Sequence, residues 1–239
     1  MPEFPGASFT SFRQFVGGKR FGKFEDHQFH LSLLPSPYVG DLSRADIFIL
    51  ALNPGFSLTD YCAEWHVPKF RRRLKRNLRQ DFDRVDFPFF LLDPEFCWHG
   101  GFAWWEGKLR EVATRIAKKK HGGRYFDALR ELSRRIAAIE LVPYHSIAFH
   151  EHRLISNSTR RAERRPLLVS AERAIHFANT VLLKRARSGK ASIIITRKVK
   201  AWGLPNARRV INYRPSLARS ASLGPKSPGG KEILRRFGI

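Results

Sequence analysis

Cysteine is scarce in this chain of 239 residues, which contains only Cys62 and Cys97. Two thiols far apart in the sequence cannot build a disulfide framework or a four-cysteine zinc or iron–sulfur site. We therefore expect no metal and no cofactor held by cysteine, and a reducing compartment such as the cytoplasm.

Long apolar runs are also missing, because no stretch reaches the roughly 18 uncharged apolar residues that a membrane helix needs. The sequence begins Met1-Pro2-Glu3-Phe4 and lacks the basic segment followed by an apolar run that marks a secretory signal. We expect no secretion and no membrane partner.

Acidic residues are few, with 21 Asp and Glu against 44 Lys and Arg, which gives a formal net charge of +23. The imbalance is greatest at the C-terminal end, where Glu232 is the only acidic residue after Glu172. A surplus of this size predicts a polyanionic partner, and DNA, single- or double-stranded, is the partner we expect. DNA binding would place a cytoplasmic protein on the nucleoid.

A second basic block lies between Lys69 and Arg79, where Phe70, Leu74 and Leu78 recur every four residues. This spacing predicts a helix with one buried stripe and basic remaining faces. A solvated helix face is the alternative, but like charges three and four residues apart repel unless an anion neutralises them. The residues predicted to contact phosphates here are Arg71, Arg72 and Lys75.

Four short apolar runs alternate with helical patterns. The strands are predicted near residues 45–52, 136–142, 191–196 and 208–212, and the helices near residues 65–80, 103–118, 124–136, 166–186 and 231–237. Alternation of this kind predicts an α/β fold, a three-layer α/β/α sandwich around a short, mostly parallel four-stranded sheet. With 43% hydrophobic residues and no linker, we expect one monomeric domain over residues 1–239. Residues 1–40 would form an aromatic-rich layer and residues 41–239 the core with its basic C-terminal part.

Ligands of such sheets bind beyond the carboxyl ends of the strands, where loops converge. Three segments qualify by their position after predicted strands. They are residues 53–57, 143–146 and 212–223.

The first of these segments carries a short motif, Ala51-Leu52-Asn53-Pro54-Gly55-Phe56-Ser57. Its simplest interpretation is a turn, since Pro fixes φ and Gly permits positive φ. In the context of a buried strand, a basic surplus and a final strand leading to Pro215-Ser216, the chain resembles the uracil-DNA glycosylase superfamily, and most closely its mismatch-specific uracil and thymine branch. The second motif of that family is similar to the stretch that starts at Asn212, although two residues separate this Asn from Pro215.

The resemblance implies a uracil-DNA glycosylase-like fold and a monofunctional DNA glycosylase of base excision repair. The enzyme would hydrolyse the N-glycosidic bond of uracil or of a related or modified pyrimidine flipped out of DNA. Asn53 would hold the attacking water, and Leu52, Pro54, Gly55 and Phe56 would border the base. Gly55 stands where the uracil-specific branch has a Tyr that excludes bulky bases, which implies a roomier pocket.

Other residues are candidates because of their chemistry. Phe102 and Trp104 could stack on an extruded base or pack in the core. Tyr144, His145 and Asn212 could donate hydrogen bonds to the departing base, and a structural role for His145 stays open. The loop residues expected to contact DNA are Arg214, Ser216, Arg219, Ser220, Ser222, Leu223 and Lys226. Leu217 or Leu223 could wedge into the base stack.

Two other classes of function remain. One is a nucleic-acid-binding protein with the same fold and no catalysis. The other is a metal-dependent nuclease built on His145, His150 and His152 with Glu151, which is disfavoured because the predicted strands carry no paired carboxylates beside a lysine.

Overall fold

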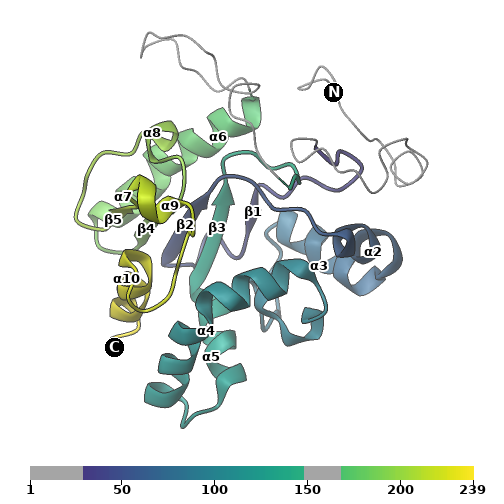
Figure 1. Cartoon of the computed structure of the whole chain (residues 1–239), viewed down its shortest axis with the longest axis horizontal. Helices are drawn as coiled ribbons and strands as arrows, with labels where there is room; N and C mark the ends of the chain where they lie inside the picture. The colour runs from purple at the N-terminus through teal and green to yellow at the C-terminus, as the bar shows by residue number, and fades with distance from the viewer. Residues whose placement is uncertain (1–28, 148–167) are drawn as a thin grey trace.

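The computed structural model describes residues 29–147 and 168–239, and its centre is one mixed sheet in the strand order β1-β3-β2-β4-β5. The strands span Tyr38–Val39 (β1), Ile47–Ala51 (β2), Ile136–Glu140 (β3), Ser192–Ile195 (β4) and Val210–Asn212 (β5). Strands β2 to β5 are parallel, and β1 pairs antiparallel with β3 (Figure 1).

Strands β2, β3 and β4 are short, mostly apolar runs that are buried on both faces, as is typical of parallel strands. Successive side chains point to opposite faces. Ile49 and Ala138 therefore contribute to one core, and Leu50 and Ile139 contribute to the other. The sheet separates two apolar clusters.

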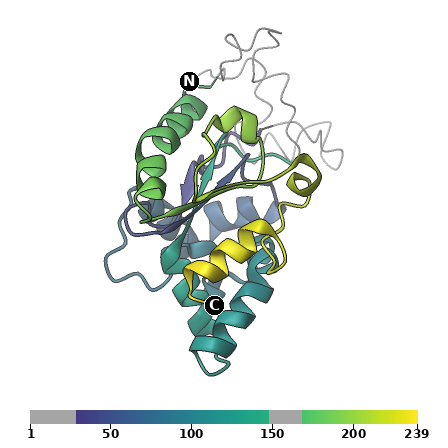
Figure 2. The same ribbon diagram turned by 90° about the vertical axis from the view of Figure 1, so that its left-hand side faces the viewer.

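Helices cover both of these faces, so the molecule is an α/β sandwich (Figure 2). The first face is covered by α2 (Leu58–His66), α3 (Pro68–Leu78), η1 (Phe90–Leu92), η2 (Pro94–Phe96), α4 (Gly100–Lys120), α5 (Tyr125–Arg135) and α10 (Pro228–Arg236). The second face is covered by α6 (Val169–Phe177), the π-helical turn η5 (Ala178–Leu182), α7 (Leu183–Arg187) and α8 (Val199–Trp202). A short helix, α9 (Pro215–Ala218), buries none of its residues.

Within the described residues the sheet has five strands, so the prediction of four was wrong by one edge strand. Strand β1 has only two residues, too few for an alternating pattern, and Gly40 follows it. A Cβ atom on Gly40 would lie 2.6 Å from the Ile136 carbonyl oxygen, and its φ is +99°. Only glycine fits this close approach to β3.

The helix predicted over residues 65–80 is two helices. Pro68 begins α3 at a position where its missing N–H costs no hydrogen bond, and Val67 separates it from α2. Phe70 and Leu74 are buried as predicted. No helix in the described part of the chain is long and apolar enough to cross a membrane. Residues 1–28, which hold most of the predicted aromatic layer, lie outside the described residues.

Candidate functional site

A pocket of about 390 Å³ lies at the carboxyl ends of the parallel strands. Its lining includes the last residues of β2 and β3, Ala51 and Glu140, and Thr196, which follows β4. The lining continues over Leu52, Asn53, Pro54, Gly55, Phe56, Asp60, Glu64, His99, Trp104, Trp105, His145, Ser146, Ile147 and Arg197. The loops after β2 and β3 therefore converge as expected for such a sheet.

Asn53 is fixed at this pocket through its side-chain nitrogen. Nδ2 donates hydrogen bonds of 2.9 Å to the Pro54 carbonyl oxygen and of 2.9 Å to Ser146 Oγ. Both described bonds of the side chain thus use the nitrogen, which leaves Oδ1 as the acceptor that a ligand can use.

Ser146 reaches Asn53 because the loops after β2 and β3 bind each other. The Val142 amide donates to the Leu52 carbonyl over 2.8 Å, and the Ser146 amide donates to Pro54 over 3.4 Å. Ser146 is 1% exposed, so water does not compete for its hydroxyl.

Asp60 links the pocket to the start of α2. Its Oδ2 accepts a 2.7 Å hydrogen bond from the Ser57 amide as part of a capping box, and its Oδ1 lies 3.0 Å from His99 Nε2. Burial alone would raise the pKa of Asp60, but contacts with His99, His145 and the Ser57 amide outweigh burial and lower it. Asp60 is therefore an anion held among histidines.

His145 lines the pocket in one orientation. Its Nδ1 lies 2.9 Å from the Gly55 carbonyl oxygen and 3.7 Å from Asp60 Oδ2, and its Nε2 lies 3.5 Å from Ser36 Oγ. A carbonyl oxygen can only accept, so Nδ1 carries the proton and Nε2 is the acceptor.

Phe56 forms part of the wall, and its ring is stacked on His30 with centroids 3.6 Å apart. Burial, and then the charge of His145, lower the pKa of His30 to about 4 against the opposing effect of Asp60. His30 is therefore neutral near pH 7 and supports Phe56 and Tyr61, whose hydroxyl lies 3.2 Å from His30 Nδ1.

Two further carboxyl groups line the pocket, and sequence reasoning missed both. Glu64 accepts a 2.9 Å hydrogen bond from the Leu34 amide, and burial raises its pKa to about 7. Glu140 is 8% exposed, and burial raises its pKa to about 8 despite the opposing charge of Arg197. Oε2 of Glu140 has no hydrogen-bond partner among the described residues. The sequence signal for Glu140 is a lone carboxyl group inside the apolar run of residues 136–142.

Of the two aromatic residues predicted to stack on a base, Trp104 belongs to the described pocket lining and Phe102 does not. Trp104 lines the pocket and is 44% exposed, with Lys108 Nζ 5.4 Å from its ring centroid. Phe102 is half-buried and does not belong to the described lining, whereas Trp105, which was not predicted, does.

Three other predicted residues lie away from the described pocket lining. Asn212 ends the outer strand β5 and donates to Asn206 Oδ1 over 3.0 Å. Tyr144 packs in the core on the α6 side of the sheet, with its ring edge to face against Phe29. Leu223 is 1% exposed in the core, so its prediction as a wedge was wrong, while Leu217 is exposed.

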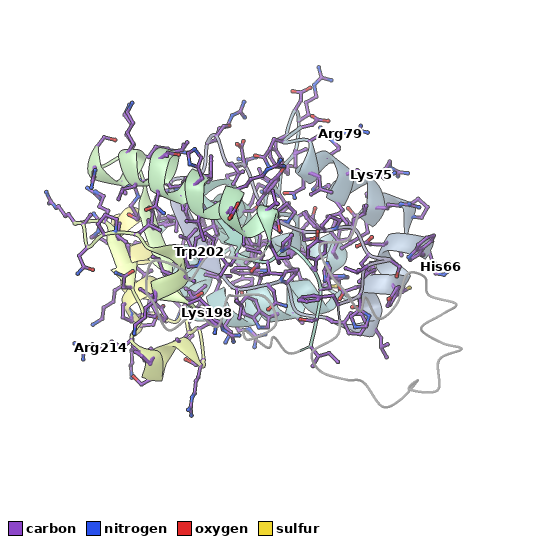
Figure 3. The ribbon with its side chains drawn as sticks, turned by 90° about the horizontal axis from the view of Figure 1, so that it is seen from above. His66, Lys75, Arg79, Lys198, Trp202 and Arg214 are labelled. Atoms are coloured by element: carbon purple, nitrogen blue, oxygen red, sulfur yellow. The ribbon has the colours of Figure 1, made fainter. Side chains whose placement is uncertain are left out.

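The predicted DNA contacts fall into two separate groups. Phe70 and Leu74 of α3 line the pocket wall, so the basic face of α3 points away from it. Lys75 and Arg214 point outward at opposite sides of the molecule (Figure 3). The connection from β5 to α10 is the group beside the pocket, because its Ala221 belongs to the lining. Its exposed predicted contacts are Arg214, Ser216, Arg219, Ser220 and Lys226, with Ser222 half-buried.

The backbone of this connection also accepts hydrogen bonds from two cationic side chains, Lys108 and Arg197. Lys108 Nζ donates to the Ser220 carbonyl, and Arg197 Nη2 donates to the Arg219 carbonyl over 3.4 Å. Burial and then the positive charge of Arg197 lower the pKa of Lys108. Two neighbouring cations of this kind are an electrostatic site for an anion.

No group of His, Cys, Asp or Glu side chains within residues 29–147 and 168–239 is arranged to hold a metal ion. The histidines proposed for a nuclease, His150 and His152, and their neighbour Glu151 lie outside the described residues.

Comparison of the chain with models of protein families, with curated proteins and with solved structures finds no match.

Proposed function

We propose that this protein is a monofunctional DNA glycosylase that hydrolyses the N-glycosidic bond of uracil or of a modified pyrimidine extruded into the pocket. One observation carries the proposal. The Asn53 amide lies at the carboxyl ends of the parallel strands, both bonds of its nitrogen are committed, and its oxygen is left for a ligand.

In this reaction a water oxygen forms a bond to the anomeric carbon C1′ of the sugar. The bond from C1′ to the base nitrogen breaks, and its electron pair leaves with the base. The proton that the water loses neutralises the base. Asn53 Oδ1 would accept a hydrogen bond from the water and aim it at C1′. An amide is a weak base, so we expect turnover to depend strongly on how good a leaving group the base is.

His145 is placed to assist the departing base. Its Nε2 makes a 3.5 Å contact with Ser36 Oγ, and its Nδ1 lies 3.7 Å from Asp60 Oδ2. Once protonated, Nε2 would donate to the negative charge that develops on the base. Asp60 acts through the ring and is a positioning residue.

The space beside Gly55 supports a substrate class wider than uracil. A Cβ atom built on Gly55 would meet nothing within 4 Å. No side chain at this position would exclude a base with a substituent at C5, as the Tyr of the resembled family does. Trp104 would cover the extruded base by stacking.

DNA would contact the connection between β5 and α10. The exposed Arg214 and Arg219, together with Lys108 and Arg197, give this side of the pocket a cationic border. A phosphate between Lys108 and Arg197 would relieve their mutual repulsion.

The test is a base-release assay on oligonucleotides that carry uracil, a thymine mismatch, hydroxymethyluracil or glucosylated cytosine, followed by detection of abasic sites. We expect release from at least one substrate, and we expect it to persist in EDTA. Loss of activity in EDTA with cut phosphodiester bonds would identify a nuclease instead.

Asn53→Ala separates catalysis from binding. We expect the variant to lose base release by about a hundredfold or more and to keep DNA affinity within about twofold. Unchanged release in Asn53→Ala would remove Asn53 from the mechanism. DNA binding with no release of any base by the unaltered protein would support the binding protein without catalysis.

A further inference from the structure

Glu140 occupies a position where an ionisable side chain is costly. It ends the central strand β3 opposite Ala51 of β2, and it is almost fully buried. Oε2 has no hydrogen-bond partner among the described residues. A buried polar atom left unpaired in this way costs roughly 1–3 kcal/mol. Its presence therefore needs an explanation, and a bound ligand is one.

The alternation of the strands points Glu140 toward the pocket. Ile49 and Ala138 face the apolar cluster under α3 and α4, and Ala51 and Glu140 follow each of them by two residues. All four therefore share one face of the sheet, and both strand ends line the pocket. Asn53 comes two residues after Ala51 and lines the same pocket.

The surroundings of Glu140 favour its neutral form. Burial raises its pKa to about 8, and Arg197 is the charged group that opposes this effect. Arg197 is instead directed to the Arg219 carbonyl, with which it forms a 3.4 Å hydrogen bond. A neutral carboxyl group has one oxygen that donates and one that accepts.

We propose that Glu140 binds the hydrogen-bonding edge of the extruded base, donating from one carboxyl oxygen and accepting at the other. This inference rests on the proposed function for the nature of the ligand. A pyrimidine with an oxo group at C4 presents the N3–H donor beside the O4 acceptor, and one with an amino group presents the N4–H donor beside the N3 acceptor. Both edges match a carboxyl group, because moving its proton exchanges the two roles. Glu140 therefore admits 4-oxo and 4-amino pyrimidines alike.

The experiment measures binding, so that it does not depend on catalysis. Duplexes carry one uncleavable 2′-fluoroarabino nucleotide with uracil or with cytosine, and a third duplex carries an abasic site. The full-length protein is compared with Glu140→Gln, Glu140→Ala and Glu111→Gln. The last variant makes the same Glu-to-Gln change on the exposed face of α4. Thermal unfolding of each variant establishes that it is folded.

We expect the unaltered protein and Glu111→Gln to prefer both base-bearing duplexes to the abasic duplex. Glu140→Ala should lose this preference by about tenfold, the effect of a lost pair of hydrogen bonds. Glu140→Gln should keep most of it for at least one of the two bases, because its amide still presents one donor and one acceptor. Above pH 8 the preference of the unaltered protein should fall, while that of Glu140→Gln stays constant.

Two results would overturn the role of Glu140. One is equal preference for base-bearing duplexes in Glu140→Ala and the unaltered protein, and the other is the same pH profile in Glu140→Gln and the unaltered protein. A protein that shows the expected binding pattern but releases no base would refute the proposed catalysis and support Glu140 as the base-binding residue.

Discussion

The Asn53 side-chain nitrogen donates a 2.9 Å hydrogen bond to Ser146 Oγ across 93 residues of sequence. This bond joins the loops after the two central strands, and it determines which end of the Asn53 amide faces the pocket. Ser146 is therefore a positioning residue for the proposed water site.

Replacing Ser146 by Ala removes one of the two bonds of the Asn53 nitrogen. A hydrogen bond of this kind contributes roughly 0.5–1.5 kcal/mol, so we expect base release to slow by about two- to tenfold. The single-turnover rate and DNA affinity are measured together, and affinity should not change. An affinity that falls in parallel with the rate would show that Ser146 supports the loop rather than the amide.

The pH dependence of stability tests the burial of Glu140. Its folded pKa, about 8, lies above the ordinary value of 4.5, so the folded protein binds the extra proton. This contribution is fully present below pH 4.5 and is lost as the pH rises to about 8. At roughly 1.4 kcal/mol per pKa unit, the loss is on the order of a few kcal/mol.

Urea unfolding at pH 5 and pH 9 measures this effect. The free energy of unfolding of Glu140→Gln, relative to the unaltered protein, should increase between the two pH values. Glu111→Gln is the matched control and should show no such gain. A constant difference between Glu140→Gln and the unaltered protein would mean that Glu140 ionises normally.

The two basic groups of the molecule should contribute differently to DNA binding. Lys108→Gln combined with Arg219→Gln removes two charges beside the pocket, whereas Arg72→Gln combined with Lys75→Gln removes two from α3. We expect the first pair to lower the slope of log affinity against log salt by about two, and the second pair to lower it less. A larger effect of the α3 pair would place the DNA on the opposite side of the protein.

Two glycines offer a matched test of the packing of α10. A Cβ atom on Gly230 would lie 1.9 Å from the Gly224 carbonyl oxygen, whereas one on Gly107, exposed within α4, would meet nothing within 4 Å. Gly230→Ala should destabilise the protein by about 1–3 kcal/mol or more, and Gly107→Ala should stabilise it by up to about 1 kcal/mol. The midpoint of urea unfolding measures both, and equal effects would contradict the close approach of α10 to the loop before it.

The parallel strands could be predicted because a strand buried on both faces is a continuous apolar run, as in Ile47–Ala51. The edge strand could not, since the two residues Tyr38–Val39 carry no period. Asn53 and His145 could be predicted as site residues because each lies in the loop that follows a buried parallel strand.

The position of a residue after a strand does not tell which way its side chain points. This is why the predicted and observed pocket residues differ. Tyr144 precedes His145 in the same loop but turns into the core on the α6 side. Glu140 was overlooked inside an apolar run, and Glu64 and His99 enter the pocket from helices that approach it only in the folded chain.

The capping box at the start of α2 gives Asp60 two tasks at once. Its carboxylate both receives the Ser57 amide and lies against His99 and His145. Strong acid that protonates this one group would fray the first turn of the helix and release both imidazole rings together. The start of α2 and the two histidines at this end of the sheet thus depend on the same carboxylate.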